Sequence, residues 1–342
     1  MRVSFLGVGG VIVRWQGAAI MTAPLYSNPT VAEIAFSEAH TDRQRMDSLM
    51  RHDVSDVRAI LSGHSHYDHL MDVPYLVLDK ARTADVVGND EMRKLLHPIE
   101  DQLSARTPPN RLVSLEGEHR YDVPGAPIRV EAILSEHSPQ MGPRLVNKTA
   151  QLLAWFVPFP EVTLWRGEHD QELDRIPERV GAWPAGTPLA FVIELLEPGT
   201  GNVAFRIYYQ DSPTRKPYGY PAQATDTHRY DLAILCMGGA TEFPAFPRDV
   251  VTHLDPKFVM GIHWEDFFNP RMLPLPGEVD RREDLLYAPG VDEGRFVEAV
   301  RAAQKPGGRT IVPCPDKVTT FSRGRGGWEI EGDDRGWTKG KK

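Results

Sequence analysis

The sequence predicts an α/β (α+β) chain in which one-sided helices lie outside β-sheets, and three observations favour this class. Short β-like runs outnumber the helical stretches, and each helical stretch has a single apolar face. No polar linker divides the 342 residues into separate cores. Helices with one apolar face pack against the outer faces of sheets. Because no linker divides the chain, we expect a single domain over residues 1–342.

The composition and charge narrow the classes of protein to which the chain can belong. With 39 Lys and Arg against 47 Asp and Glu, the net charge is −8, so we expect no nucleic-acid partner. No apolar run approaches the roughly 20 residues that a membrane-spanning helix needs. The chain opens directly on a β-like run, so we expect it in the cytoplasm, or exported if a leader was removed.

The first third of the chain has the pattern of an antiparallel sheet. β-like runs over residues 3–6, 11–15 and 18–21 alternate with tight turns. Gln16-Gly17 is a hairpin turn between the last two runs. A short apolar strand follows at residues 57–61.

Three stretches show helical spacing, and six more read as strands. Residues 73–81 follow a helix cap at Asp72 and carry Pro74 in their first turn. The other two helices are defined by apolar residues that recur at helical spacing: Met92, Leu95, Leu96, Ile99 and Leu103, then Phe296, Val297, Val300 and Ala303. The further strands are expected at residues 128–134, 189–195, 203–210, 232–236, 258–262 and 310–312.

Residues 138–188 resist this alternation, and we expect them to form an aromatic-rich insertion or lid within the domain. Prolines interrupt the segment, and its aromatic residues include Trp155, Phe156, Phe159, Trp165 and Trp183. These side chains either pack the insertion against the body of the domain or form an apolar wall for a substrate. The sequence leaves both interpretations open.

Three histidines and one aspartate follow the strand at residues 57–61 within six positions: His64, His66, Asp68 and His69. His64 and His66 are two positions apart on extended chain, so their imidazoles project to one side. The turn that follows lets Asp68 and His69 fold back towards the same space. Neutral imidazole nitrogens and carboxylate oxygens are ligands that zinc takes, so metal binding explains the cluster better than four unrelated polar side chains do.

The pattern His64-x-His66-x-Asp68-His69 resembles the metal motif of the metallo-β-lactamase superfamily. The resemblance implies a four-layer αββα sandwich, in which two sheets lie between outer helices and one or two metal ions sit at the sheet edge. It also implies three further ligands, each just past a later strand. The residues in those places are His137, Asp211 and His263.

The resemblance further implies two groups of ligands around two divalent metal ions. The first group is His64, His66 and His137. The second group is Asp68, His69 and His263, and Asp211 bridges the two ions. Zinc is the expected metal, with manganese or iron as alternatives, and a hydroxide between the ions would attack the substrate. Asp68 or Asp211 would orient this hydroxide or pass a proton to the leaving group, and the sequence does not choose between them.

One position departs from the pattern of the family. Relatives commonly carry an aspartate after the second hairpin strand, and here Ala23 stands in that place. If the aspartate normally orients a metal-binding histidine, its loss weakens metal affinity unless Thr22 or another neighbouring group compensates.

Within the superfamily, Asp211-Ser212-Pro213 and His263-Trp264-Glu265 resemble the branch that holds N-acyl-phosphatidylethanolamine phospholipase D and the ascorbate-phosphate lactonase. This implies a zinc-dependent hydrolase that cleaves an ester-type bond, a phosphodiester before others, in a small-molecule or lipid-like substrate. Two alternatives stay open: a lactonase or carboxylic esterase at the same metals, and a metal-binding scaffold or sensor with little catalysis. The sequence leaves the oligomeric state open.

Overall fold

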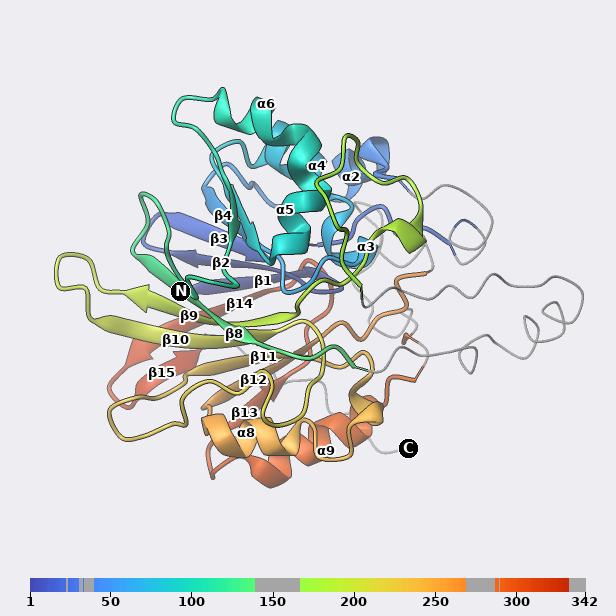
Figure 1. Cartoon of the computed structure of the whole chain (residues 1–342). Coiled ribbons are helices and arrows are strands. Elements are labelled where there is room, and N and C mark those ends of the chain that lie inside the picture. Colours follow the sequence, from blue (N-terminus) through green and yellow to red (C-terminus); the bar gives the residue numbers. More distant parts are fainter. Residues whose placement is uncertain are drawn as a thin grey trace, which may run out of the picture.

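Two large sheets face each other, and helices cover the outer face of each (Figure 1). The computed structural model describes residues 1–22, 24–30, 33, 40–138, 167–268, 287–288 and 290–331. The helices α2 (Arg43–Leu49), α5 (Asp90–Leu96) and α6 (Glu100–Ser104) lie outside one sheet, and α8 (Arg248–Leu254) and α9 (Glu293–Ala303) lie outside the other. The four-layer αββα order that the sequence predicts is therefore confirmed.

The eight-stranded sheet joins an antiparallel half to a parallel half. Its strands, in spatial order, are β15 (Gly327–Ile330), β14 (Val318–Gly324), β1 (Arg2–Gly7), β2 (Gly10–Trp15), β3 (Ala18–Thr22), β4 (Val57–Leu61), β5 (Asp85–Gly88) and β6 (Leu112–Ser114). The expected hairpins are present as β1, β2 and β3, whereas β3 to β6 run parallel. Side chains alternate between the faces: Val11 and Val13 of β2 face the other sheet, and Ile12 faces the helices.

The seven-stranded sheet brings four strand ends to one edge. Its strands, in spatial order, are β13 (Arg309–Ile311), β12 (Phe258–Ile262), β11 (Leu232–Cys236), β10 (Val203–Gln210), β9 (Leu189–Leu196), β8 (Ile128–Leu134) and β7 (Arg120–Asp122). β10, β11 and β12 run parallel, and β9 is antiparallel to both β8 and β10. The carboxyl ends of β8, β10, β11 and β12 therefore lie at the same edge of the sheet.

Two apolar clusters hold the layers together. One lies between the sheets and includes Phe191 and Phe205, and the other lies between the first sheet and its helices and includes Met92 and Leu95. All four side chains are buried, and each contributes roughly 1.5–3 kcal/mol relative to an exposed position. The loops at the sheet edges therefore start from a rigid base.

The chain over residues 73–81 differs from the single capped helix that the sequence predicts. It forms α4 (Val73–Tyr75) followed directly by a π-helical turn (Leu76–Lys80). Asp72 does not cap it. The buried carboxylate instead accepts hydrogen bonds from the backbone N–H groups of Tyr26 and Ser27 and from the Ser27 hydroxyl, at 2.5–2.8 Å. The tertiary partners of Asp72 thus override the local capping signal.

The other two helical patterns are confirmed with refinements. The first becomes α5 and α6, which a short 3-10 turn (His97–Ile99) separates. The second becomes α9, where Asp292 is the cap and its side chain accepts a hydrogen bond from the Arg295 N–H at 2.9 Å.

Most of the expected insertion lies outside the described residues, including Trp155, Phe156, Phe159 and Trp165. At its described end, Trp183 is fully buried in the cluster between the first sheet and its helices. The Leu173 N–H also donates to the carbonyl oxygen of Lys94 in α5, at 3.1 Å. Packing therefore accounts for Trp183, whereas the assignment of residues 138–188 as an insertion or lid stays a prediction.

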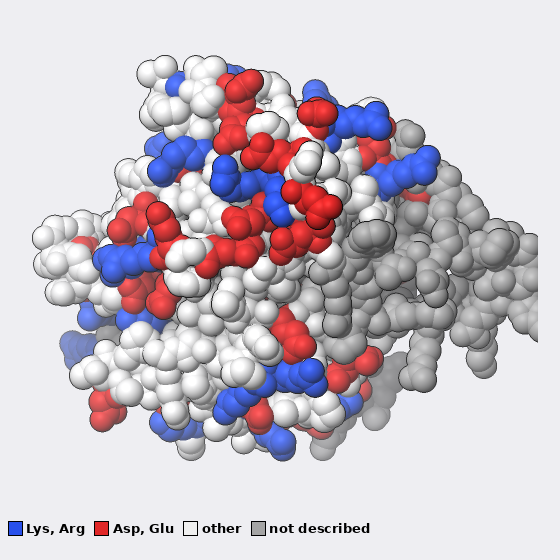
Figure 2. Space-filling view, in the orientation of Figure 1, with Lys and Arg blue, Asp and Glu red and all other residues white. Residues whose placement is uncertain are grey.

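The charged surface agrees with the negative net charge. Figure 2 shows acidic side chains gathered over the upper half of the face in view, with Lys and Arg interspersed among them. This face offers no continuous basic surface of the kind that binds a phosphate backbone. In the described part of the chain, every helix is too short or too polar to cross a bilayer.

Candidate metal centre

The loop after β4 is fixed by hydrogen bonds around the first candidate ligands, His64 and His66. The Ser62 hydroxyl donates to the backbone carbonyl of His64 at 2.8 Å. The Ser65 hydroxyl donates to Oδ1 of Asn89, the cap of α5, at 2.7 Å. The conformation of this loop is therefore set by the helix layer as well as by the sheet.

Seven candidate ligands meet where the loop after β4 faces the edge of the second sheet. His66 lies directly before the short helix α3 (Tyr67–Leu70), which carries Asp68 and His69. The other three candidates come from the second sheet: His137 after β8, Asp211 after β10 and His263 after β12. Six of the seven are at most 8% exposed, and His137 is half-buried. The structure thus gathers every ligand candidate that the sequence names.

His64, His66 and His137 form the first group. Each offers a ring nitrogen, and these nitrogens lie within 4.8 Å of one another. The three ring centroids are 4.7–4.8 Å apart, at interplanar angles of 72–85°. The Nδ1 atom of His137 lies 2.7 Å from the carbonyl oxygen of Ser138, which can only accept. The proton of a neutral His137 is therefore on Nδ1, and Nε2 has a free lone pair.

Asp68, His69 and His263 form the second group. Oδ2 of Asp68 lies 3.4 Å from Nε2 of His69 and 3.5 Å from Nε2 of His263. His64 also lies close, because one of its nitrogens is within 4.8 Å of ligand atoms of both Asp68 and His69. The two groups are therefore adjacent, and His64 stands where they meet.

Asp211 lies between the groups, where the sequence expects a bridging carboxylate. Its Oδ1 is 3.1 Å from Nδ1 of His64, and its Oδ2 is 3.6 Å from Nδ1 of His69. The Gly63 N–H donates to Oδ2 at 3.1 Å. A Cβ atom at Gly63 would come within 2.5 Å of both carboxylate oxygens, so only glycine lets Asp211 approach this closely.

Burial and mutual proximity set the protonation of the imidazoles. Burial, followed by the neighbouring imidazoles, lowers the pKa of His66 well below its usual value. Burial is also the main cause that lowers the pKa of His69 to about 4 and that of His137 to about 3. His263 is the exception, because its contact with Asp68 outweighs burial and raises its pKa. Three imidazoles are thus neutral at pH 7, which is the form that binds metal.

The carboxyl groups of Asp68 and Asp211, in contrast, are ionised. Burial alone would raise the pKa values of Asp68 and Asp211, but the adjacent imidazoles outweigh it and lower both. For Asp68 the main partners are His69 and His263, and for Asp211 they are His64 and His69. Both carboxylates are therefore ionised at neutral pH, as ligands must be.

Three buried imidazole nitrogens and the chemistry of the donor set are consistent with a divalent cation at this site. Nε2 of His66, Nδ1 of His69 and Nδ1 of His263 are buried and have no hydrogen-bond partner within the described ranges. Buried polar atoms without partners are rare because desolvation is costly. Five imidazoles and two carboxylates form the nitrogen and oxygen donor set that zinc prefers.

The position of Ala23 lies outside the described residues, but its neighbour Thr22 is described. The Thr22 hydroxyl donates to the carbonyl oxygen of Gly9 at 2.5 Å and accepts from the Val11 N–H at 2.8 Å. Thr22 thus supports the turn beside the site, and neither of these bonds reaches His69. The expectation that Thr22 compensates directly at a histidine stays untested.

The sequence assigns no role at the site to three residues that support it: Gly63, Asn89 and Glu265. Gly63 sits inside the motif segment, but its role depends on a contact with Asp211, 148 residues away. Asn89 shows a local signal, since Asn before a helical stretch predicts a cap. Its bond to Ser65 gives no such signal in the sequence.

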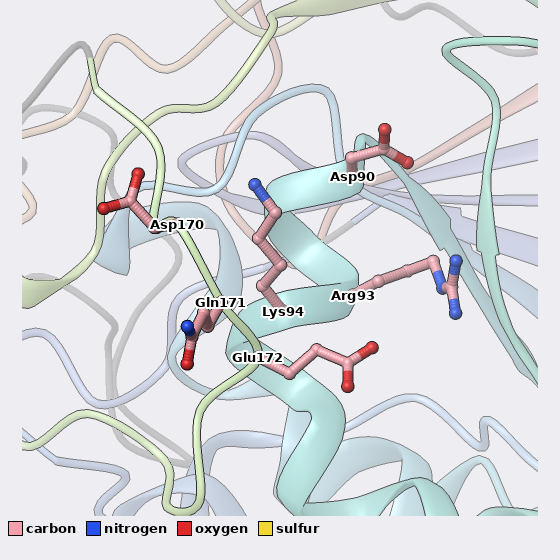
Figure 3. Close-up of a pocket in the computed structure, with 6 residues that line it drawn as sticks. All are labelled: Asp90, Arg93, Lys94, Asp170, Gln171 and Glu172. Atoms are coloured by element: carbon pink, nitrogen blue, oxygen red, sulfur yellow. The ribbon is translucent and has the colours of Figure 1, made fainter.

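A separate cavity of about 440 Å³ lies on α5, away from the seven ligand candidates (Figure 3). Its lining residues are Asp90, Arg93, Lys94, Asp170, Gln171 and Glu172. The two basic side chains are balanced by three acidic ones, and no nucleophile or imidazole is among them. The lining of this cavity therefore contains none of the seven ligand candidates.

Comparison with known proteins finds similarity of structure only. No family model matches the chain, and no curated protein matches it. It is similar to a metallo hydrolase from Ignicoccus hospitalis (14% identity, TM-score 0.49, covering 94% of this chain and 98% of that one). It is also similar to isothiocyanate hydrolase from Delia radicum gut bacteria (11%, 0.48, 94% and 100%) and to a possible metal-dependent hydrolase from Veillonella parvula (11%, 0.45, 93% and 98%). At such identities and TM-scores, these likenesses say nothing about the reaction of this chain.

Proposed function

We propose that this chain is a hydrolase that depends on two divalent cations. His64, His66 and His137 would hold the first cation. Asp68, His69 and His263 would hold the second, and Asp211 would lie between the two. The observation that carries this proposal is the meeting of seven side chains from four separate segments at one buried rim, where three imidazole nitrogens make no hydrogen bond to a described residue. Zinc matches this donor set best, and manganese and iron are the alternatives for metal analysis.

The chemistry follows from the charges of the site. Bound divalent cations lower the pKa of water towards neutrality and neutralise charge that develops on the attacked group. Asp68 and Asp211 are ionised, so each can accept a proton from water or orient it. The Gly63 N–H donates a hydrogen bond to Oδ2 of Asp211, which helps to orient the carboxylate.

We infer that the bond cleaved is an ester-type bond and place a phosphodiester first. A pair of cations suits in-line displacement at phosphorus, because it can stabilise both the attacking and the leaving oxygen. A lactone or carboxylic ester, attacked at its carbonyl by the same centre, is the second candidate. We also propose that the substrate is a small or lipid-like molecule, because the residues around Asp211 and His263 resemble those of the phospholipase and lactonase branch. The substrate panel tests this part of the proposal.

The test compares the metal-loaded wild type with His66→Ala, Asp211→Asn and the control His97→Ala. His97 is a partly exposed histidine on the 3-10 turn after α5, so its loss controls for removal of an imidazole. The panel contains bis(p-nitrophenyl) phosphate, a γ-lactone and p-nitrophenyl acetate. We expect phosphodiester turnover in the wild type and His97→Ala, and a loss of about 100-fold or more in the other two variants. Turnover that survives complete removal of metal would contradict the proposal, and full metal occupancy without turnover of any substrate would favour a scaffold or sensor.

A further inference from the structure

Glu265 is a buried carboxylate that the proposed chemistry does not use. Glu265 follows the candidate ligand His263 by two residues in the sequence, and it is 3% exposed. Oε1 accepts a hydrogen bond from the Val8 N–H, and Oε2 accepts one from the Trp264 N–H at 3.1 Å. One carboxylate thus joins two backbone segments that are more than 250 residues apart.

Both segments have a backbone conformation that needs support. Val8, in the turn between β1 and β2, has φ of 50°, and His263, just after β12, has φ of 57°. Side-chain-bearing residues rarely adopt such values, and a β-branched residue does so least of all. These conformations persist where the surroundings hold them, and the carboxylate of Glu265 pairs with Val8 and with the residue after His263.

Each segment also touches the second group of ligands. Gly9 follows Val8, and a Cβ atom at Gly9 would come within 2.7 Å of Nδ1 of His69. The backbone of this turn therefore packs directly against the His69 imidazole. His263 belongs to the other segment, and its Nε2 lies 3.5 Å from Asp68.

The turn at Gly9 is held from its other side as well. Its carbonyl oxygen accepts hydrogen bonds from the Tyr209 hydroxyl at 2.7 Å and from the Thr22 hydroxyl. The backbone beside His69 is thus hydrogen-bonded to both sheets, and Glu265 connects it to the segment that carries His263. The two segments that Glu265 joins therefore contact His69 and include His263, the two imidazoles of the second group, whereas His66 and His137 belong to the first group.

We propose that Glu265 is a positioning residue that sets the spacing between His69 and His263, and thereby governs binding of the second cation but not of the first. This inference rests on the proposed two-cation centre.

The chemistry of the side chain predicts a graded response. Glutamine keeps one oxygen that can accept one of the two N–H groups, but it presents an NH₂ donor to the other. Alanine removes both carboxylate acceptors, so it takes away more of the hydrogen bonding than glutamine does. Binding of the second cation should therefore weaken from wild type to Glu265→Gln and further to Glu265→Ala.

The control is Asp231→Asn. Asp231 is another partly buried carboxylate, and its Oδ2 accepts a hydrogen bond from the Arg206 N–H at 2.8 Å. It lies at the start of β11, at the end of the second sheet opposite the metal centre. This variant removes a half-buried carboxylate charge without touching either turn.

The experiment titrates the metal-free full chain with Zn²⁺ in a calorimeter and repeats the titration with Co²⁺, whose visible absorption reports the ligand geometry. We expect two equivalents in the wild type and in Asp231→Asn. In Glu265→Gln we expect one equivalent of unchanged affinity and a second weakened about 10- to 100-fold, with loss of the second Co²⁺ spectrum in Glu265→Ala.

The outcomes separate the two proposals. A wild type that binds no cation overturns the proposed function itself. A wild type that binds two, together with glutamate variants that bind both with equal affinity, overturns the role of Glu265 and leaves the function standing. Equal weakening of both cations also overturns the selective role. If Glu265→Ala does not fold, the Glu265→Gln titration decides.

Discussion

At the scale of single residues, the lack of a Cβ atom at Gly63 determines how closely the carboxylate of Asp211 can approach the histidines. Gly63 stands between His64 and the end of β4, and it faces the carboxylate of Asp211. The absence of a side chain lets a carboxylate from the second sheet reach the histidine loop of the first. The position of Asp211 beside His64 and His69 therefore depends on glycine here.

Gly63→Ala tests this dependence. The added methyl group would lie within 2.5 Å of both oxygens of Asp211, so the carboxylate must move away from His64 and His69. We expect cation affinity to fall at least about 10-fold and the free energy of unfolding to fall by about 1–3 kcal/mol. Calorimetric titration and urea unfolding measure the two effects.

The matched control is Gly117→Ala, because a Cβ atom there meets nothing within 4 Å. It should change neither quantity beyond about 0.5 kcal/mol. Equal metal affinity in the two alanine variants would contradict the account of Gly63.

At the scale of elements, the N-terminus of α5 connects the helix layer to the metal centre. The side chain of Asn89 accepts hydrogen bonds from the Met92 N–H at 2.8 Å and from the Ser65 hydroxyl at 2.7 Å. Its amide group also donates to the carbonyl oxygens of Ala185 and Thr187, at 2.8 and 3.0 Å. One fully buried side chain thus holds a helix, the histidine loop and the segment before β9.

Asn89→Ala should therefore affect stability and metal binding together. Loss of a cap and of buried bonds predicts a fall of roughly 2–4 kcal/mol in the free energy of unfolding. Because Ser65 separates His64 from His66, we also expect weaker binding of the first cation. Urea unfolding and zinc titration of the same preparation measure both.

The cap of α9 serves as the comparison. Asp292→Ala removes the hydrogen bond to the Arg295 N–H, an exposed cap outside the metal centre, and should cost about 1 kcal/mol. Its zinc titration should match that of the wild type. A shift in zinc affinity as large as that of Asn89→Ala would show that the effect comes from lost stability and not from the loop.

The elements also show where prediction from sequence succeeds. The strands β9, β10 and β11 are predicted to within a residue because apolar side chains run along most of their length and most of these are buried. The short strands β6 and β7, with three residues each, have too few side chains to show a period. The strand β14 mixes buried and exposed polar residues, so its pattern resembles a loop.

In the candidate site too, the sequence predicts some residues and not others. The seven ligand candidates could be named because each lies in the motif or just past a strand whose end is visible in the sequence. The contacts of Glu265 with Val8 could not, because nothing local in either segment specifies its partner. Pairing between distant segments requires the three-dimensional fold.

At the scale of the whole molecule, Asp72 makes stability depend on pH. Burial raises its pKa to about 6, against about 3.9 for an unfolded chain. The folded protein thus holds this proton more tightly than the unfolded chain does. Its stabilising contribution is complete below about pH 4 and is lost as the pH rises through about 6.

Asp72→Asn removes this dependence, because the amide stays neutral and its oxygen can still accept the N–H groups of Tyr26 and Ser27. Relative to the wild type, we expect the variant to gain about 1–3 kcal/mol of unfolding free energy between pH 4 and pH 7. Urea unfolding of both metal-free proteins across this range measures the gain. A difference that stays constant with pH would contradict the assignment.

The most direct test of the central claim is a crystal structure of the zinc-loaded chain with anomalous data on both sides of the zinc absorption edge. The proposed centre predicts two anomalous peaks, about 3.5–4 Å apart, with Asp211 between them. The other ligands at these peaks should be His64, His66 and His137, and Asp68, His69 and His263. Peaks at other side chains, or none among these seven, would show that the imidazoles gather for a reason other than binding metal.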